Sequence, residues 1–368
     1  MRTRGKLIGL AAGAAGVAAA GVAARFVQRG RQISHRDVGD HPPFGSLRSD
    51  PITVVADDGL PLHAEVDELD RELAATARDR RREELTPTLV FVHGYALDLD
   101  CWHFQRAGYR GQARLVLYDQ RSHGRSARSP DHHATIEQLG SDLKRVLDDL
   151  TGVEPVILVG HSMGGMTVMS LAERHPELFG TKVVGAALIS TSAGGLDIGR
   201  ILFPLLPAGM GPGIVTRLVS TLSRGSGLVD RLRAVGRDVA RVIVDTYAFG
   251  SGDVPASYVD FTYDMLDKTP FSVVADFFPA FASLDHWTHL EHLARVPTSV
   301  ICGTRDKITS VSHSRKLHAA IKGSDLLECH GAGHMVVLEC HNDVNDQLDD
   351  LIARVVARLA DEAGDGRR

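Results

Sequence analysis

The 368-residue chain has few cysteines, no excess of basic charge and no nucleotide-binding pattern. Its four cysteines, at positions 101, 302, 329 and 340, are scattered and form no C-x-x-C pair, which excludes a disulfide framework. The 41 lysines and arginines are outnumbered by 46 aspartates and glutamates, so the charge indicates no nucleic-acid partner. Because neither G-x-G-x-x-G nor a Walker pattern occurs, we expect no nucleotide, flavin or other cofactor.

One cluster near the C-terminus has the residue types of a zinc site: Cys329, His330, His334, Cys340 and His341. The close pairing of ligands that is typical of structural zinc sites is missing. We therefore expect no metal there, and His334 is assigned a different role below.

The N-terminal 30 residues are predicted to form a signal or membrane-anchor segment. Three basic residues precede eighteen uncharged ones, residues 7–24, which could just cross a bilayer but are mostly alanine and glycine. Small residues at positions 22 and 24 fit a signal-peptide cleavage site, whereas the arginines from position 25 onward favour retention of the downstream side in the cytoplasm. We expect a membrane-associated or exported protein. The alternative is a cytoplasmic protein in which this segment is a frayed helix with no membrane role.

Short apolar runs rich in β-branched residues follow one another along the chain, separated by helical periods. Such runs predict parallel strands buried on both faces, and their alternation with helices predicts a doubly wound, mostly parallel α/β sheet. The runs are 89–92, 115–118, 156–159, 183–189 and 299–302. A hairpin is expected over residues 52–66, and a solvated, charged helical excursion over residues 68–85.

From Leu196 to Leu290 the patterning is helical and contains no clear parallel strand, so this stretch is an insertion between two strands. Half of the twenty aromatic residues lie within it, between Tyr247 and Trp287. The chain is accordingly divided into segments 1–30 (signal or anchor), 31–50 (linker), 51–195 (first part of the α/β core), 196–290 (helical insertion), 291–360 (second part of the core) and 361–368 (polar tail).

The strand at 156–159 leads directly into Gly160-His161-Ser162-Met163-Gly164 and then into a helix. A sharp strand-to-helix turn needs small residues two before and two after its central residue, and both are glycine here. Such a turn presents the Ser162 hydroxyl at the carboxyl edge of the sheet, over a helix N-terminus. Ser162 is the predicted nucleophile.

A serine nucleophile needs a base, and the base needs an orienting acid. After the strand at 299–302 comes Asp306, which we expect to be the acid, and His334 in the glycine-rich loop 329–335 is the expected general base. His330 competes for the role of base, but Gly333 beside His334 favours the latter. For the oxyanion hole, the expected donors are the backbone N–H groups of Met163 and of Tyr95.

These residues resemble the α/β-hydrolase fold enzymes, in their serine-dependent esterase, lipase and peroxidase-like branch. The resemblance covers about residues 52–360, and Ser122 departs from it where the family usually has glycine. The matching motifs, in order, are His93-Gly94, Asp119-Gln-Arg121-Ser-His-Gly124-Arg-Ser126, the Ser162 turn, Gly303-Thr-Arg-Asp306 and Gly331-Ala-Gly-His334.

The resemblance implies that the insertion 196–290 is a helical cap over the active site. Related branches with aspartate as nucleophile act on epoxides or haloalkanes, so Ser162 favours an acyl-serine route instead. We expect cleavage of a small-molecule carboxylic ester with an apolar acyl or alcohol group, since the cap is rich in aromatic residues, and a lipid-derived ester is one candidate. Thioester, amide, carbon–carbon and perhydrolase chemistry on the same residues stay open, as does a non-catalytic, membrane-tethered binding protein.

Overall fold

The computed structural model describes residues 28–29, 32–33, 36, 41–70, 86–130, 133–196 and 236–365. The predicted anchor at 7–24, most of the charged excursion at 68–85 and the first part of the insertion, 197–235, lie outside these residues. The helices and strands in chain order are β1 (Pro51–Val55), β2 (Pro61–Asp67), β3 (Thr88–Val92), η1 (Leu99–Trp102), α4 (His103–Tyr109), β4 (Leu115–Tyr118), α5 (Ile136–Leu150), β5 (Val156–His161), α6 (Met163–Arg174), η3 (Pro176–Leu178), β6 (Val183–Ile189), α10 (Arg237–Ala248), α11 (Ala256–Lys268), α12 (Phe271–Ala282), η4 (Trp287–Arg295), β7 (Thr298–Gly303), α13 (Val311–Ala320), β8 (Asp325–Cys329), α14 (Val336–Glu339) and α15 (His341–Asp365).

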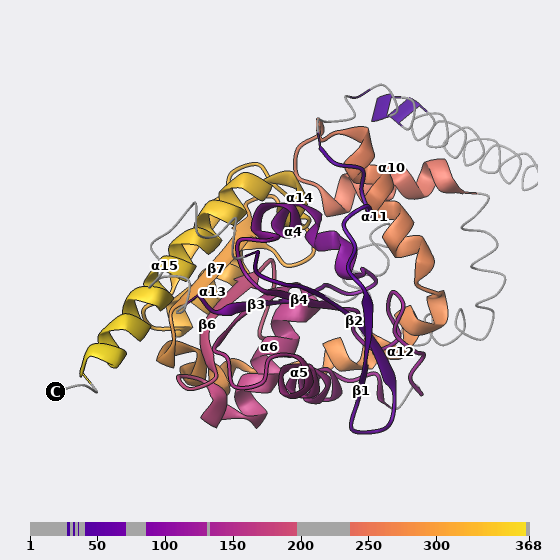
Figure 1. Cartoon of the computed structure of the whole chain (residues 1–368). Coiled ribbons are helices and arrows are strands. Elements are labelled where there is room, and N and C mark those ends of the chain that lie inside the picture. The colour runs from indigo at the N-terminus through magenta and orange to yellow at the C-terminus, as the bar shows by residue number, and fades with distance from the viewer. Residues whose placement is uncertain are drawn as a thin grey trace, which may run out of the picture.

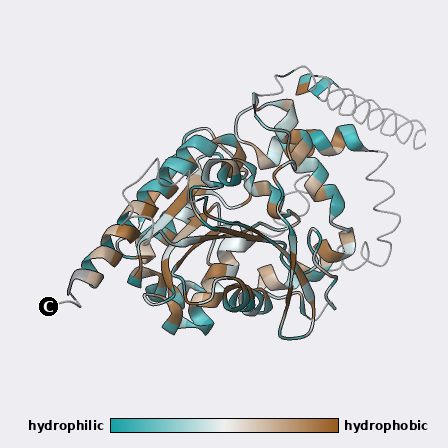
Figure 2. Cartoon of the chain, in the orientation of Figure 1, coloured by the Kyte–Doolittle hydropathy of each residue, from teal (hydrophilic) through white to brown (hydrophobic). Residues whose placement is uncertain are grey.

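The strands of this part of the chain form one eight-stranded sheet in the order β1-β2-β4-β3-β5-β6-β7-β8. The hairpin β1–β2 and the β2–β4 pair are antiparallel, and all pairs from β4 to β8 are parallel. The predicted fold class, a doubly wound and mostly parallel α/β sheet, is confirmed. Helices lie on both of its faces. Figure 1 shows the strands at the centre of the molecule, and Figure 2 shows that they are apolar.

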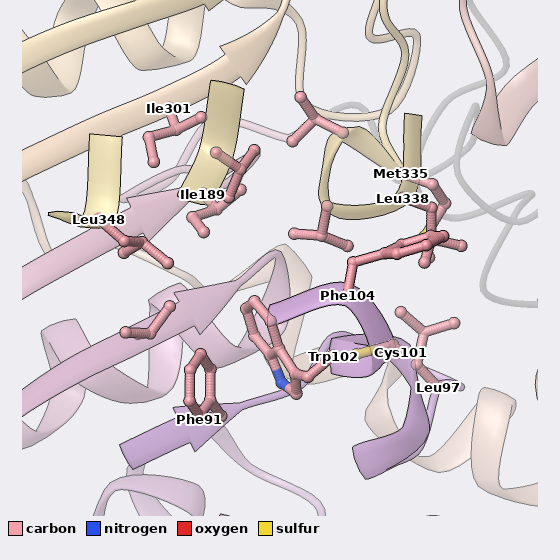
Figure 3. Close-up of a cluster of buried hydrophobic side chains, with 14 of the residues drawn as sticks. Phe91, Leu97, Cys101, Trp102, Phe104, Ile189, Ile301, Met335, Leu338 and Leu348 are labelled. Atoms are coloured by element: carbon pink, nitrogen blue, oxygen red, sulfur yellow. The ribbon is translucent and has the colours of Figure 1, made fainter. Parts of the chain in front are cut away.

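Alternate residues of each central strand face two separate hydrophobic cores. On β3, Val90 and Val92 pack with α5 and α6, whereas Leu89 and Phe91 pack with α4, α14 and α15. Figure 3 shows the second core, where Trp102 lies beside Phe91 at a ring distance of 5.1 Å. Both faces of the strands are therefore buried, which explains their continuous apolar runs.

The helices α10, α11, α12 and the 3₁₀ helix η4 lie between β6 and β7 in sequence. The four phenylalanines of α12 are all buried, at 9% exposure or less. The boundaries 196 and 290 of the insertion stay a prediction.

Residues of the predicted linker, and Arg29 just before it, pack on the folded part of the chain. Ile33 is fully buried, and Phe44 stacks on Phe261 of α11 with ring centroids 4.1 Å apart. Arg29 and Arg36 both pair with the buried carboxylate of Asp245 on α10, at 3.1 and 2.5 Å. The segment before β1 is thus attached to the insertion helices.

Candidate active site

Ser162 lies in a tight turn between the end of β5 and the start of α6. Its backbone has φ 53° and ψ −118°, a strained conformation for a residue with a side chain. A Cβ on Gly164 would lie 2.0 Å from the carbonyl oxygen of Val92, so only glycine allows this turn to sit against β3. The strain and the close packing hold the Ser162 hydroxyl at the carboxyl edge of the sheet.

The structure brings Asp306 and His334 to this serine. Nε2 of His334 lies 3.0 Å from Oγ of Ser162, and Nδ1 of His334 lies 2.9 Å from Oδ2 of Asp306. Asp306 follows β7 and His334 follows β8, so parallel strands deliver all three side chains to one edge of the sheet. All three residues are buried, at 5–7% exposure.

Hydrogen bonds fix the orientation of the Asp306 carboxylate. Oδ1 accepts the backbone N–H groups of Ile308 and Thr309, at 2.8 and 2.9 Å, and Oδ2 lies 2.9 Å from the Thr309 hydroxyl. Burial acts to raise the pKa of Asp306, but His334 and these hydrogen bonds outweigh it and hold that pKa below its usual value. An ionised Asp306 accepts a hydrogen bond from the Nδ1–H group of His334, which leaves Nε2 as the acceptor for the serine hydroxyl.

The other histidines of the region are arranged differently. His330 is exposed, so the position between Ser162 and Asp306 is occupied by His334. Burial lowers the pKa of His93 and of His161 to about 3, and that of His123 to about 4. His93 bonds the carbonyl of Gly94 and accepts the N–H of Gln120, so it braces the loop after β3.

The loop that contains Tyr95 touches the serine turn. A Cβ on Gly94 would lie 3.1 Å from the Cβ of Ser162, which places the backbone of this loop directly against the candidate nucleophile. Met163 is the first residue of α6, so its N–H belongs to the positive end of that helix. Both expected oxyanion donors therefore come from segments that border Ser162.

The family model of the alpha/beta hydrolase family matches residues 89–347 of the chain, which include β3, the serine turn, Asp306 and His334. The chain belongs to the alpha/beta hydrolase family. It is accordingly a hydrolase of the α/β fold.

Individual members of the family are similar to this hydrolase over different lengths. An uncharacterized protein of Mycobacterium tuberculosis is 28% identical over 261 residues, which cover 67% of this chain and 70% of the relative. The sn-1-specific diacylglycerol lipase ABHD11 of Mus musculus is 40% identical over 100 residues, 27% of this chain and 32% of that protein. A thermophilic esterase from Thermogutta terrifontis has a TM-score of 0.64 at 19% identity, with 83% of this chain and 99% of that chain covered. The similarity to the esterase structure shows the fold alone.

Two residues at the site of this hydrolase were missed by the sequence analysis. Thr309 contacts both Asp306 and, at 2.8 Å, the carbonyl of Ser190. Glu339 accepts the N–H of Gly333 in the His334 loop at 2.7 Å, and it also accepts N–H groups from residues 250 and 251. Thr309, three residues after Asp306, fits a local turn signal, whereas Glu339 has no sequence signal because two of its partners lie 88 and 89 residues away.

The five-residue cluster with zinc-site composition does not come together as such. Among the described residues, the one group with ligand atoms close enough to hold a metal is Cys329, Cys340 and Asp343. His334 instead faces Ser162 and Asp306, and the ring of His341 stacks on Phe104 at 3.8 Å.

No helix within the described ranges is both long and apolar enough to span a bilayer. Residues 7–24 lie outside those ranges.

Proposed function

We propose that this hydrolase cleaves a carboxylic ester through an acyl-serine intermediate on Ser162. The observation that carries the proposal is the chain of contacts from Ser162 Oγ through His334 to Asp306, at 3.0 and 2.9 Å. A nucleophile, a base within hydrogen-bonding distance and an acid that orients the base are the parts that acyl transfer requires.

In the proposed mechanism, His334 takes the proton of Ser162 as its oxygen attacks the ester carbonyl. The backbone N–H groups of Tyr95 and Met163 stabilise the oxyanion, while Asp306 stabilises the charge on the ring. His334 then gives its proton to the leaving alkoxide. A water molecule activated by the same histidine attacks the acyl-enzyme and releases the acid.

The surroundings of Tyr95 support an apolar acyl or alcohol group. The ring of Tyr95 lies 5.0 Å from that of Phe281 and 6.3 Å from that of Phe277, both on α12. An apolar wall beside the oxyanion loop favours burial of hydrocarbon. The names of the similar lipase and esterase are consistent with this substrate class.

The test is labelling with a fluorophosphonate probe, which reacts with activated serines. We expect the wild type and Ser192→Ala to be labelled, and Ser162→Ala to remain unlabelled, with kcat lower by roughly 10⁶-fold. Ser192 is the matched control, because its Oγ also lies close to a histidine nitrogen, 2.8 Å from Nδ1 of His313. Labelling that survives Ser162→Ala would contradict the proposal.

Acyl-chain length tests the substrate class. We expect kcat/KM to be higher for medium- or long-chain p-nitrophenyl esters than for the acetate, because longer chains bury more apolar surface. A flat or reversed dependence on chain length would contradict the apolar substrate. Faster turnover of matched thioesters or amides would assign the same residues to those bonds instead.

We also propose that residues 7–24 associate with a membrane. The support is their lack of charge and the attachment of the following residues, Arg29 and Arg36, to Asp245 of α10, which would hold the folded part close to the bilayer. In a density gradient, the full chain is expected to float with lipid vesicles. A chain that lacks residues 1–24 is expected to remain at the bottom of the gradient. Equal flotation of the two would refute the anchor.

A further inference from the structure

Two cysteines meet at the base of the loop that carries His334. Cys329 is the last residue of β8, and Cys340 directly follows α14. Their sulfur atoms lie within 4.8 Å of each other and of the Asp343 carboxylate. The residues between them, 330–339, contain His334, so a covalent link here would close a ring around the candidate base.

The two thiols differ in exposure. Cys329 is 3% exposed, whereas Cys340 is half-buried and can be reached from solvent. Burial raises the pKa of the two remaining cysteines, Cys101 and Cys302. Cys340 is the most accessible of the four thiols and is thus the one best placed to react first.

The segment between the two cysteines is already held in place. Met335 and Leu338 are buried in the core beside Phe104 (Figure 3). Glu339, next to Cys340, accepts the N–H of Gly333 at 2.7 Å. Because the sulfurs are already neighbours and the loop is fixed on both sides, a bond between them requires little movement of His334.

We propose that Cys329 and Cys340 form a reversible modification site that a small-molecule disulfide such as oxidised glutathione converts into an intramolecular disulfide. The Cys340 thiol loses its proton to water, and the resulting thiolate attacks one sulfur of the reagent. The S–S bond of the reagent breaks and one thiol is released. Cys329 then loses its proton and attacks the Cys340 sulfur, which forms the protein disulfide and releases the second thiol. The two protein thiols are oxidised by two electrons, and the reagent is reduced to two thiols.

The disulfide stabilises the His334 loop. It closes a ring of about 12 residues, which in the chain-entropy model shifts the folding equilibrium by about 100-fold toward the folded state. The thermal midpoint is therefore expected to rise by roughly 5 °C, and the alignment of His334 with Ser162 is retained.

A metal ion is the competing use of the same sulfurs. Cys329, Cys340 and Asp343 offer three ligands, but Asp343 is exposed and a structural zinc site has four. Since a bound metal would block the oxidation, the experiment distinguishes the two.

The experiment treats the reduced, desalted full chain with oxidised glutathione and measures its intact mass. The wild type is expected to lose two hydrogen atoms, and a reducing agent is expected to restore them. Glu-C protease, which cuts after Glu339, should leave the Cys329 and Cys340 peptides joined by the disulfide. Ser162 takes no part in this chemistry, so a failure of the proposed esterase reaction would not change the masses.

Matched variants test which thiol attacks the reagent first and which one completes the disulfide. Cys329→Ser is expected to trap one glutathione on Cys340, because the second thiol is missing, and Cys340→Ser is expected to gain nothing. Cys302→Ser should behave like the wild type. If a variant fails to fold, alkylation of wild-type Cys340 before but not after oxidation gives the same answer.

Three results would overturn the proposal. One is a wild-type mass that does not change, and another is a stable glutathione adduct on wild-type Cys340. The third is a reduced protein that holds one equivalent of zinc and is oxidised only after chelation.

Discussion

The contact between the Gly94 backbone and Ser162 allows a direct test of the proposed oxyanion hole. In Gly94→Ala the new Cβ would lie 3.1 Å from the Cβ of Ser162 and 2.8 Å from Nδ1 of His161. Carbon atoms pack at about 3.5–4.0 Å, so the loop must retreat by roughly 0.4–0.9 Å. A Tyr95 N–H that starts at about 2.9 Å from the oxyanion then ends near 3.6 Å, too far for a hydrogen bond. Loss of one such donor lowers kcat by about 10²–10³-fold, or ~3–4 kcal/mol.

The assay is steady-state hydrolysis of a p-nitrophenyl ester, with thermal unfolding measured on the same samples. We expect KM to stay within about threefold of the wild type, because the lost interaction forms in the transition state. Gly185→Ala is the matched control, since its Cβ would lie 2.8 Å from Cγ2 of Val355, in the half of β6 away from the serine turn. It should lower the thermal midpoint and leave kcat unchanged. Unchanged kcat in a folded Gly94→Ala, or an equal loss of kcat in both variants, would refute the reasoning.

Further predictions concern the residues around the acid and the histidine loop. Thr309→Val should lower kcat about tenfold because Asp306 loses a hydrogen-bond partner, and Thr309→Ser should restore it in the same assay. Glu339→Gln should lower the free energy of unfolding by about 2 kcal/mol in a urea titration, since the charged acceptor for Gly333 and two other N–H groups is removed. The pKa of Asp306 is lowered in the folded state, so its stabilising contribution is present above the usual aspartate pKa and is lost as the pH falls through the lower folded value. Thermal midpoints measured as the pH falls through that range should therefore decline less steeply in Asp306→Asn than in the wild type.

The central sheet and the serine turn could be predicted because their signals are local. Strands buried on both faces are continuous apolar runs, and a strand that runs into closely spaced glycines specifies a tight turn. β8 was missed because Asp325–Cys329 mixes charged and apolar residues, and its burial is only partial. As the edge strand of the sheet it pairs with β7 alone, and an edge strand needs no continuous apolar run.

Contacts that join residues far apart in the sequence could not be predicted. Arg36 was placed in a linker, yet it pairs with Asp245, which lies 209 residues later. α15 likewise continues to Asp365, into the predicted polar tail 361–368, since a polar segment can extend a helix whose earlier turns are buried. The hydrophobic period of a helix or strand can be found in a single sequence, but the distant residues that it contacts cannot.

Tyr95 links the proposed chemistry to the helices of the insertion. Its backbone N–H is an expected oxyanion donor, while its hydroxyl donates to the carbonyl of Val274 on α12 and its ring packs against Phe281. A shift of α12 when a substrate binds would therefore move the same residue that we expect to stabilise the transition state. Substitutions on α12 that alter acyl-chain preference should, for this reason, change kcat as well as KM. The expected oxyanion donor and the contacts with α12 thus belong to one residue, Tyr95.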